Sequence, residues 1–133
     1  MRVALDTNVI VSALATRGLC ADLFQAVLAE HDLIVGETVL VELRKVLSRK
    51  LRLPNATIDA LDGFIRRQAL VVSAEPQEAT ARVEAADATV LAEAQAAAAD
   101  VLVTGDQDLL RVLHPPVRIV APRQLWELIR RAP

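Results

Sequence analysis

The chain is poor in cysteine, histidine and aromatic residues, and each shortage excludes a class of protein. Cys20 is the only cysteine, so an internal disulfide is impossible, and without a nearby Cys or His at ligand spacing we interpret it as a packing residue. Aromatic residues make up 2% of the chain and tyrosine is absent, which argues against recognition of bases on an aromatic platform. We expect His31 and His114 to be solvent-exposed loop residues rather than catalytic groups.

Long apolar runs are missing as well, and so is a large excess of charge of either sign. No run of about eighteen uncharged apolar residues exists, and Asp6 breaks the first apolar stretch, unlike a signal peptide. These features and the single cysteine predict a cytoplasmic protein with no membrane partner. The net charge of −2 gives no global attraction to nucleic acid, so a nucleic-acid partner would need a local basic patch.

Short strands alternating with amphipathic helices are what the sequence does contain. The 133 residues are 53% hydrophobic, which predicts one folded domain over 1–133. Short β-branched segments predict strands, apolar stripes predict helices, and a polar connection is expected at 76–84. This alternation predicts a three-layer α/β/α sandwich with a short, mainly parallel central sheet. The predicted strands are 2–5, 33–35, 70–72, 101–103 and 117–120, and the predicted helices are 7–14, 21–30, 38–50, 57–68, 87–99 and 122–130.

Acidic residues follow two of the predicted strands. Asp6 comes directly after the first strand, and Asp106 and Asp108 follow the fourth. In an open α/β sheet, ligands bind outside the carboxyl ends of the strands. A carboxylate at a buried strand end is costly unless it is paired, hydrogen-bonded or bound to a metal.

Two more acids lie on predicted helices beside the stripes that face the core. Glu42 follows Val39 by three residues, and Asp87 precedes Val90 by three. Simpler interpretations exist for single residues. Asp6 and Asp87 could be helix N-caps, Glu42 could pair with a basic residue of its own helix, and Asp106 and Asp108 could be turn residues.

The joint placement of four acids at one sheet edge is what these simpler interpretations do not explain. Clustered carboxylates repel one another and raise one another's pKa. A divalent cation removes that conflict, and oxygen ligands favour Mg²⁺ or Mn²⁺ over zinc.

Four segments of the chain together resemble the PIN-domain ribonucleases, in particular the VapC-like toxin components of toxin–antitoxin pairs. The segments are VALDTNVIVSAL, ETVLVELRKVL, EAADATVLAEA and ADVLVTGDQDLL, which occur in the family's order. By resemblance, Asp6, Glu42 and Asp87 match the first three metal-binding acids. Asp106 matches the fourth, with Asp108 as its rival. Thr104 matches a hydroxyl that supports the site, and Asn8 is a second supporting residue.

The resemblance implies a PIN-like fold and a function. It implies a Mg²⁺- or Mn²⁺-dependent endoribonuclease, the toxin of a type II pair, with RNA as its substrate, a cognate antitoxin as its partner and a homodimer as its assembly. The alternative is a catalytically inactive PIN-like module that binds RNA or protein. One position departs from the family, in which many members carry Asp-Pro-x-Asp where this chain has Glu84-Ala85-Ala86-Asp87, so a role for Glu84 stays open.

A basic run lies next to Glu42 and is the candidate for the local basic patch that a nucleic-acid partner would need; its members are Arg44, Lys45, Arg49, Lys50 and Arg52. We predict that Arg44, Lys45 and Arg49 contact RNA phosphates, although a solvated helix face explains any one of them equally well. Phosphotransfer to an aspartate is a weaker alternative. Haloacid-dehalogenase-like phosphatases need a second Asp where Asn8 stands, and a receiver domain needs a late lysine, whereas no lysine follows Lys50.

Overall fold

A single five-stranded sheet forms the centre of the protein. The structure is a computed structural model that describes residues 1–76 and 83–131. All strand pairs are parallel, and the strand order is β3-β2-β1-β4-β5. The expected α/β class with a parallel sheet between helices is confirmed. The strands are β1 (Arg2–Leu5), β2 (Asp32–Gly36), β3 (Leu70–Val72), β4 (Val101–Val103) and β5 (Ile119–Val120).

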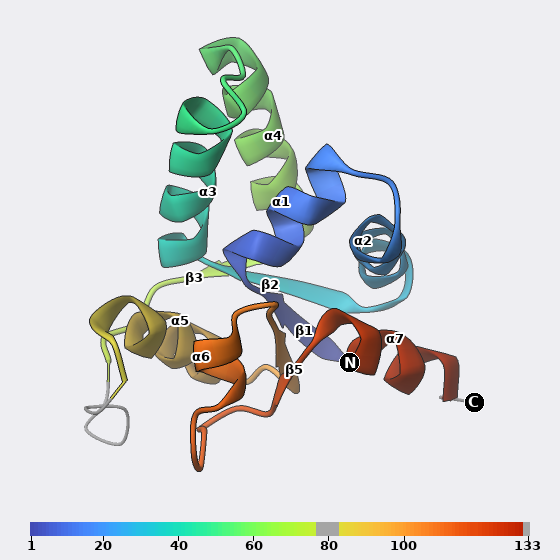
Figure 1. Ribbon diagram of the computed structural model, residues 1–133, viewed down its shortest axis with the longest axis vertical. Helices are drawn as coiled ribbons and strands as arrows, with labels where there is room; N and C mark the ends of the chain where they lie inside the picture. The colour runs from blue at the N-terminus through green and yellow to red at the C-terminus, as the bar shows by residue number, and fades with distance from the viewer. Residues whose placement is uncertain (77–82, 132–133) are drawn as a thin grey trace.

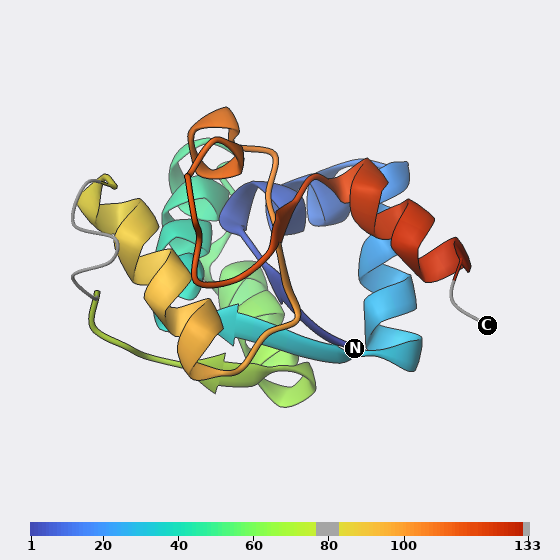
Figure 2. The same ribbon diagram turned by 90° about the horizontal axis from the view of Figure 1, so that it is seen from below.

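Helices cover both faces of the sheet. In Figure 1, α1 to α4 lie on one side and α5 and α6 on the other, while α7 packs beside α2 (Figures 1 and 2). This arrangement places the loops after β1 and β4 next to each other. The helices are α1 (Thr7–Ala15), α2 (Leu19–Glu30), α3 (Glu37–Arg49), α4 (Asn55–Gln68), α5 (Ala85–Ala96), α6 (Gln107–Leu110) and α7 (Pro122–Arg131).

Burial on both faces explains why the strands are apolar throughout rather than alternating. Val3 and Leu5 of β1 are at most 1% exposed, and all three residues of β4 are buried. Their neighbours on the helix side include Ile10 and Leu91, which are 0% exposed. A parallel sheet covered on each face requires this pattern.

Several boundaries differ from those predicted. The last strand covers only Ile119–Val120, although Arg118 O just before it still accepts from the backbone N–H of Leu102 at 2.8 Å. The helix predicted over 87–99 spans Ala85–Ala96 and ends there because Ala98 adopts a positive φ of 54°. The polar connection expected at 76–84 falls mainly on 77–82, which lie outside the described residues.

Cys20 and the two histidines can now be placed. Cys20 is partly buried on α2 and packs against the core, as predicted. His114 is exposed, as expected, but the expectation for His31 is wrong. His31 caps the end of α2, where its backbone N–H bonds Val27 O, and its ring is half-buried with Nδ1 shielded from solvent.

Within residues 1–76 and 83–131, no individual helix has both the length and the apolar character needed to cross a membrane. Helices α1 and α2 pass that test only as a pair, with a bend of 104° between them. Both bury residues in the core, including Ile10 of α1 and Leu23 of α2.

Candidate active site

The two strands that are followed by candidate aspartates, β1 and β4, are neighbours in the sheet. The parallel pairing aligns Leu5 with Val103, and the backbone N–H of Asp6 donates to Val103 O at 2.9 Å. Asp6 and Asp106 therefore leave the sheet at the same edge, although one hundred positions separate them in the chain.

Asp6 is held by three hydrogen bonds. Thr104 Oγ1 donates to Asp6 Oδ2 at 2.7 Å, and Asn8 Nδ2 donates to the same oxygen at 3.2 Å. The backbone N–H of Thr7 donates to Asp6 Oδ1 at 2.8 Å, so Asp6 is also the N-cap of α1. Asp6 is 7% exposed and Thr104 is 0% exposed. The orientation of this carboxylate is therefore fixed before any ligand arrives.

The same network joins the loops after β1 and β4. Asn8 Oδ1 accepts from the backbone N–H of Gly105 at 2.8 Å, and Asn8 Nδ2 donates to Thr104 Oγ1 at 3.3 Å. Thr104 Oγ1 in turn accepts from the backbone N–H of Asp106 at 3.0 Å. Asn8 and Thr104 thus position the segment that carries Asp106, a geometry that suits the supporting role expected of both.

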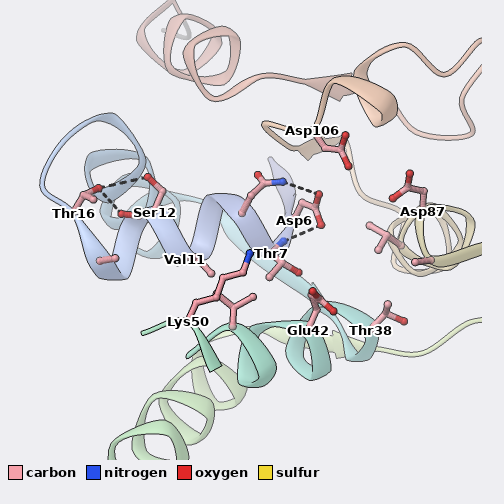
Figure 3. A pocket seen from close by; sticks show the side chains of 15 residues that line it. Asp6, Thr7, Val11, Ser12, Thr16, Thr38, Glu42, Lys50, Asp87 and Asp106 are labelled. Atoms are coloured by element: carbon pink, nitrogen blue, oxygen red, sulfur yellow. Dashed lines mark hydrogen bonds between the residues drawn. The ribbon is translucent and has the colours of Figure 1, made fainter. Parts of the chain in front are cut away.

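Four acids from four parts of the fold line one cavity of about 590 Å³. Asp6 and Asp106 come from strand ends, Glu42 from α3 and Asp87 from α5. Figure 3 shows their carboxylates turned toward a common space. The structure therefore brings together the four residues that the sequence placed at one edge. Asp108 is exposed and does not belong to this lining, while its backbone N–H donates to Asp106 Oδ1 at 2.9 Å.

The electrostatics of the cavity reflect this crowding. Burial raises the pKa of Asp6, the negative charge of Asp106 adds to the rise, and hydrogen bonds from Thr104 and Thr7 oppose it. The pKa of Asp87 is also raised, first by burial and then by the charges of Asp106, Asp6, Glu84 and Asp108. Negative charge at this edge is therefore unfavourable as it stands and would be relieved by a cation.

The simpler interpretations of the single acids are correct for some of these residues and wrong for others. The cap interpretation holds for Asp6, and Asp106 likewise caps α6. It is wrong for Asp87, because Glu84 occupies the N-cap position of α5 and Asp87 lies inside the first turn. The interpretation of Glu42 as the partner of a basic residue on its own helix is also wrong. The four salt bridges among the described residues involve neither Glu42 nor Lys45 nor Arg49.

The residues around the cavity fit a hard divalent cation by their chemistry. The donors are carboxylate oxygens, which suit Mg²⁺ and Mn²⁺. In residues 1–76 and 83–131, however, no three Asp, Glu, His or Cys side chains stand close enough to hold one ion directly. Mg²⁺ keeps several waters and binds through one or two carboxylates, so acids spread around a cavity can contact it through water.

The basic residues predicted to contact RNA lie beside the acid cavity rather than in it. Arg44, Lys45 and Arg49 line a groove between α3 and α4. Arg44 is paired with Asp59 at 2.8 Å in an exposed salt bridge. Lys45 also lines a second cavity, between α3 and α5, that includes Glu42.

The sequence analysis missed one residue and did not single out another. Lys50, one member of the basic run, lines the acid cavity. Its spacing could have singled it out, because Glu42, Val46 and the C-cap Lys50 recur at four-residue intervals along one face of α3. Glu93 of α5 is 3% exposed and accepts from the backbone N–H of Thr38 with both carboxylate oxygens at 3.2 Å. The sequence around a glutamate that caps a different helix contains no pattern that identifies this role.

The expected family is confirmed. A PIN-domain family model matches residues 2–108, so the chain belongs to the PIN-domain family. PIN domains are typically nucleases and are generally metal-dependent. No curated protein sequence matches the chain.

Several solved structures share the fold across their whole length. VapBC2 from Rickettsia felis, bound to a promoter DNA fragment, is 16% identical with a TM-score of 0.64, covering 91% of this chain and 98% of that one. DNA-bound VapBC from Salmonella typhimurium is 21% identical with a TM-score of 0.64, covering 92% and 98%. PAE2754 from Pyrobaculum aerophilum is 17% identical with a TM-score of 0.65, covering 99% and 97%. The chain is thus structurally similar to the VapC class that its sequence resembles.

Proposed function

We propose that the protein is a Mg²⁺- or Mn²⁺-dependent endoribonuclease. The observation that supports this most is the meeting of Asp6, Glu42, Asp87 and Asp106 at one cavity on the carboxyl edge of a parallel sheet. In a PIN domain, acids in this arrangement suit phosphodiester hydrolysis better than binding alone.

The chain's own residues divide the work. Asp6 would be the ligand of fixed orientation, because Thr104 and Asn8 hold it, and Asp87 and Glu42 would approach from helices on opposite sides. Asp106 caps α6 with one oxygen and faces the cavity, so it would bind the ion directly or through water. A bound Mg²⁺ or Mn²⁺ supplies an activated water for in-line attack and stabilises the leaving oxygen. No side-chain nucleophile is required.

A catalytically inactive module is the second candidate. It is favoured by the spacing of the acids, because no three of the described metal-binding side chains converge on one point. In that case RNA or a protein would bind at the same edge without metal.

Cleavage of a mixed-sequence single-stranded RNA separates the two candidates. We expect cutting with Mg²⁺ or Mn²⁺ that EDTA stops, and fragments that end in 5′-phosphate and 3′-hydroxyl, because water is the nucleophile. Asp6→Asn and Asp87→Asn should abolish cutting while circular dichroism shows an intact fold. Cutting that survives EDTA, or ends in a 2′,3′-cyclic phosphate, contradicts the mechanism, and metal-independent RNA binding without cutting supports the inactive module.

We further propose that the protein is the toxin of a type II pair, with a cognate antitoxin as partner. Its similarity to VapBC structures supports this assignment, as does that to FitAcB from Neisseria gonorrhoeae (19% identical, TM-score 0.60, covering 91% of this chain and 98% of that one). A small DNA-binding reading frame directly upstream of the gene, whose product co-purifies with this chain and suppresses cleavage, is the expected result. A gene neighbourhood without such a frame contradicts it.

A homodimer with both cavities open along a shared groove is the assembly we propose. Large apolar side chains remain exposed on the helices, including Val41 at 54% and Phe64 at 37%, and a partner subunit would cover them. Light scattering across a dilution series should show a dimer, and a monomer at micromolar concentration contradicts it.

A further inference from the structure

The acid cavity continues away from the acids as a trough between α1 and α3. Its walls at that end are apolar, with Val11 and Ala15 from α1 facing Val46 from α3, and the hydroxyls of Ser12 and Thr16 border it. Figure 3 shows this side of the cavity next to the acids, with Lys50 reaching in from α3. The catalytic mechanism above uses none of these residues.

Among the lining residues that belong to 1–76 and 83–131, Lys50 is the only cation. Lys50 is the C-cap of α3 and keeps a helical backbone (φ −93°, ψ −46°). Its four-residue spacing from Val46, and that of Val46 from Glu42, continues the same helix face, about 12 Å along the axis from Glu42. A helical side chain leans toward the N-terminus of its helix, so the ammonium is carried back toward the acids. It therefore stands beside the acid cluster and not within it.

Within the described part of the chain, Lys50 also has no acidic partner. No carboxylate of residues 1–76 or 83–131 lies within 4.0 Å of it, whereas Arg44 is paired with Asp59 and Arg66 with Glu37 and Asp62. Pairing with the cavity acids would be the expected arrangement if Lys50 served only to neutralise them. An exposed ammonium held at the rim of an acidic cavity, and left unpaired, is instead free to bind an external anion.

We propose that Lys50 binds a backbone phosphate of a single-stranded RNA lying in the trough, next to the phosphate at the acids. The inference rests on the proposed function and extends it, because it assigns the path of the strand. The adjoining ribose and base lie against the apolar wall formed by Val11, Ala15 and Val46. This wall supplies contact area in a protein that has almost no aromatic surface. Lys50 is a positioning residue for the substrate and takes no part in bond breaking.

The proposal separates two routes that the basic residues of α3 offer. A strand in the trough meets Lys50, whereas a strand over the outer groove between α3 and α4 meets Arg44 and Arg49. Arg44 already engages Asp59, which weakens the outer route. On either route the bond that is cut lies at the acids, so cleavage alone does not distinguish them.

Salt dependence of binding does distinguish them. The probe is a short, fluorescein-labelled single-stranded RNA of mixed sequence, titrated with the intact chain in EDTA so that nothing is cut. Each phosphate contact on a single strand contributes about 0.7 to the slope of log affinity against log salt. Lys50→Gln should therefore lower that slope by about 0.7, and Lys50→Arg should restore it. Arg123→Ala, which removes an exposed cation on α7, is the matched control and should leave the slope unchanged.

The results that overturn the proposal are equally specific. An unchanged slope in Lys50→Gln does so, as does a slope that falls in Arg49→Ala alone, which assigns the strand to the outer groove. Lack of any RNA binding at the lowest salt also overturns it and leaves the trough to a protein segment. These outcomes are independent of cleavage. Metal-dependent cutting that Asp6→Asn abolishes, together with an unchanged slope, refutes the strand path and leaves the proposed function standing.

Discussion

Two buried carboxylates, Asp6 and Glu93, lie in regions of the protein that differ in what surrounds them. Asp6 is 7% exposed at the β1–β4 end, and Glu93 is 3% exposed between α3 and α5. Burial is the main cause that raises the pKa of each. Around Asp6 are side-chain donors, further acids and a cavity. Around Glu93 are the backbone N–H of Thr38 and the backbone of Gly36, which has no side chain.

The comparison teaches that a buried acid with a raised pKa is not in itself a sign of a catalytic site. Glu93 stabilises the N-terminus of α3, which has no side-chain cap of its own. A carboxylate at this position satisfies free N–H groups and complements the helix dipole. The charge of Glu37 adds a little to the raised pKa of Glu93, but Asp6 shares a cavity with three further acids. That larger charge conflict is what a cation would resolve.

The largest effect we expect comes from removing the donor beneath Asp6. Thr104→Val keeps the shape of the side chain but deletes a 2.7 Å hydrogen bond to a buried carboxylate. We predict a loss of about 1.5–3 kcal/mol in the free energy of unfolding. We also predict a fall of about 10–100-fold in cleavage rate, because supporting groups orient metal ligands.

Urea unfolding and initial cleavage rates measure both effects. Thr89→Val is the matched control, since the Thr89 hydroxyl donates to Ala85 O on α5 and does not touch Asp6. If the two variants lose activity equally, the Thr104 bond has no special part in orienting the site.

We expect the binding of Mn²⁺ to depend on Asp6 and not on Glu93. Mn²⁺ binds the native state alone, so it should raise the melting temperature with increasing concentration, worth about 2.7 kcal/mol at one hundred times Kd. Asp6→Asn should lose this dependence, whereas Glu93→Gln should keep it. Thermal melts in a Mn²⁺ series test the difference, and a parent-like Mn²⁺ response in Asp6→Asn rules Asp6 out as a ligand.

The sequence predicted the sheet and the gathering of the four acids well, for a physical reason. Strands buried on both faces are recognisable from composition, and residues that follow parallel strands must meet at one edge. The metal roles of these acids stay predictions. The sequence left open whether Asp106 or Asp108 is the fourth acid, because the choice depends on local geometry. In the structure Asp106 lines the cavity, whereas the backbone N–H of Asp108 donates to the carboxylate of Asp106.

Glu93 and Lys50 show where such reasoning stops. Glu93 acts across the sequence on a helix that begins 56 positions earlier, at Glu37, and only packing brings the two together. Lys50 looked like one member of a basic run, and its neighbours Arg44 and Arg49 turned out to face the α3–α4 groove. Which cation of a helix faces a site depends on how the helix is rotated against the sheet.

A smaller effect should come from filling the space beside Glu93. Gly36 has an ordinary extended backbone (φ −74°, ψ 151°), so its lack of a side chain matters for space and not for conformation. A Cβ there would overlap Glu93 Oε1 and lie 2.8 Å from Glu93 Cδ. We predict that Gly36→Ala lowers the free energy of unfolding by about 1–3 kcal/mol.

A double-mutant cycle measured by urea unfolding identifies the cause of that loss. In a Glu93→Ala background the two carboxyl atoms that crowd the added methyl group are gone, and only the Cβ of residue 93, at 3.1 Å, remains close. Gly36→Ala should therefore be less destabilising there than in the parent. Equal losses in the two backgrounds would mean that the methyl group disturbs something other than Glu93.

The smallest effect is a pH dependence that the two carboxylates should share. The folded-state pKa of Glu93 is raised, so the folded protein binds more protons than the unfolded chain above the ordinary glutamate pKa. The parent therefore loses stability relative to Glu93→Gln as pH rises through that raised pKa, and below the ordinary value the difference is constant. Asp6→Asn in EDTA should show the same sign of the stability difference from the parent, because the pKa of Asp6 is raised too.

Urea unfolding across a pH series measures both stability differences. If the difference between the parent and Glu93→Gln stays flat or has the opposite trend, the charged carboxylate of Glu93 in the parent is well stabilised by the helix that it caps. If the same sign appears in both variants while only Asp6→Asn loses its Mn²⁺ response, then burial sets the titration of each acid and the neighbours of Asp6 set its function.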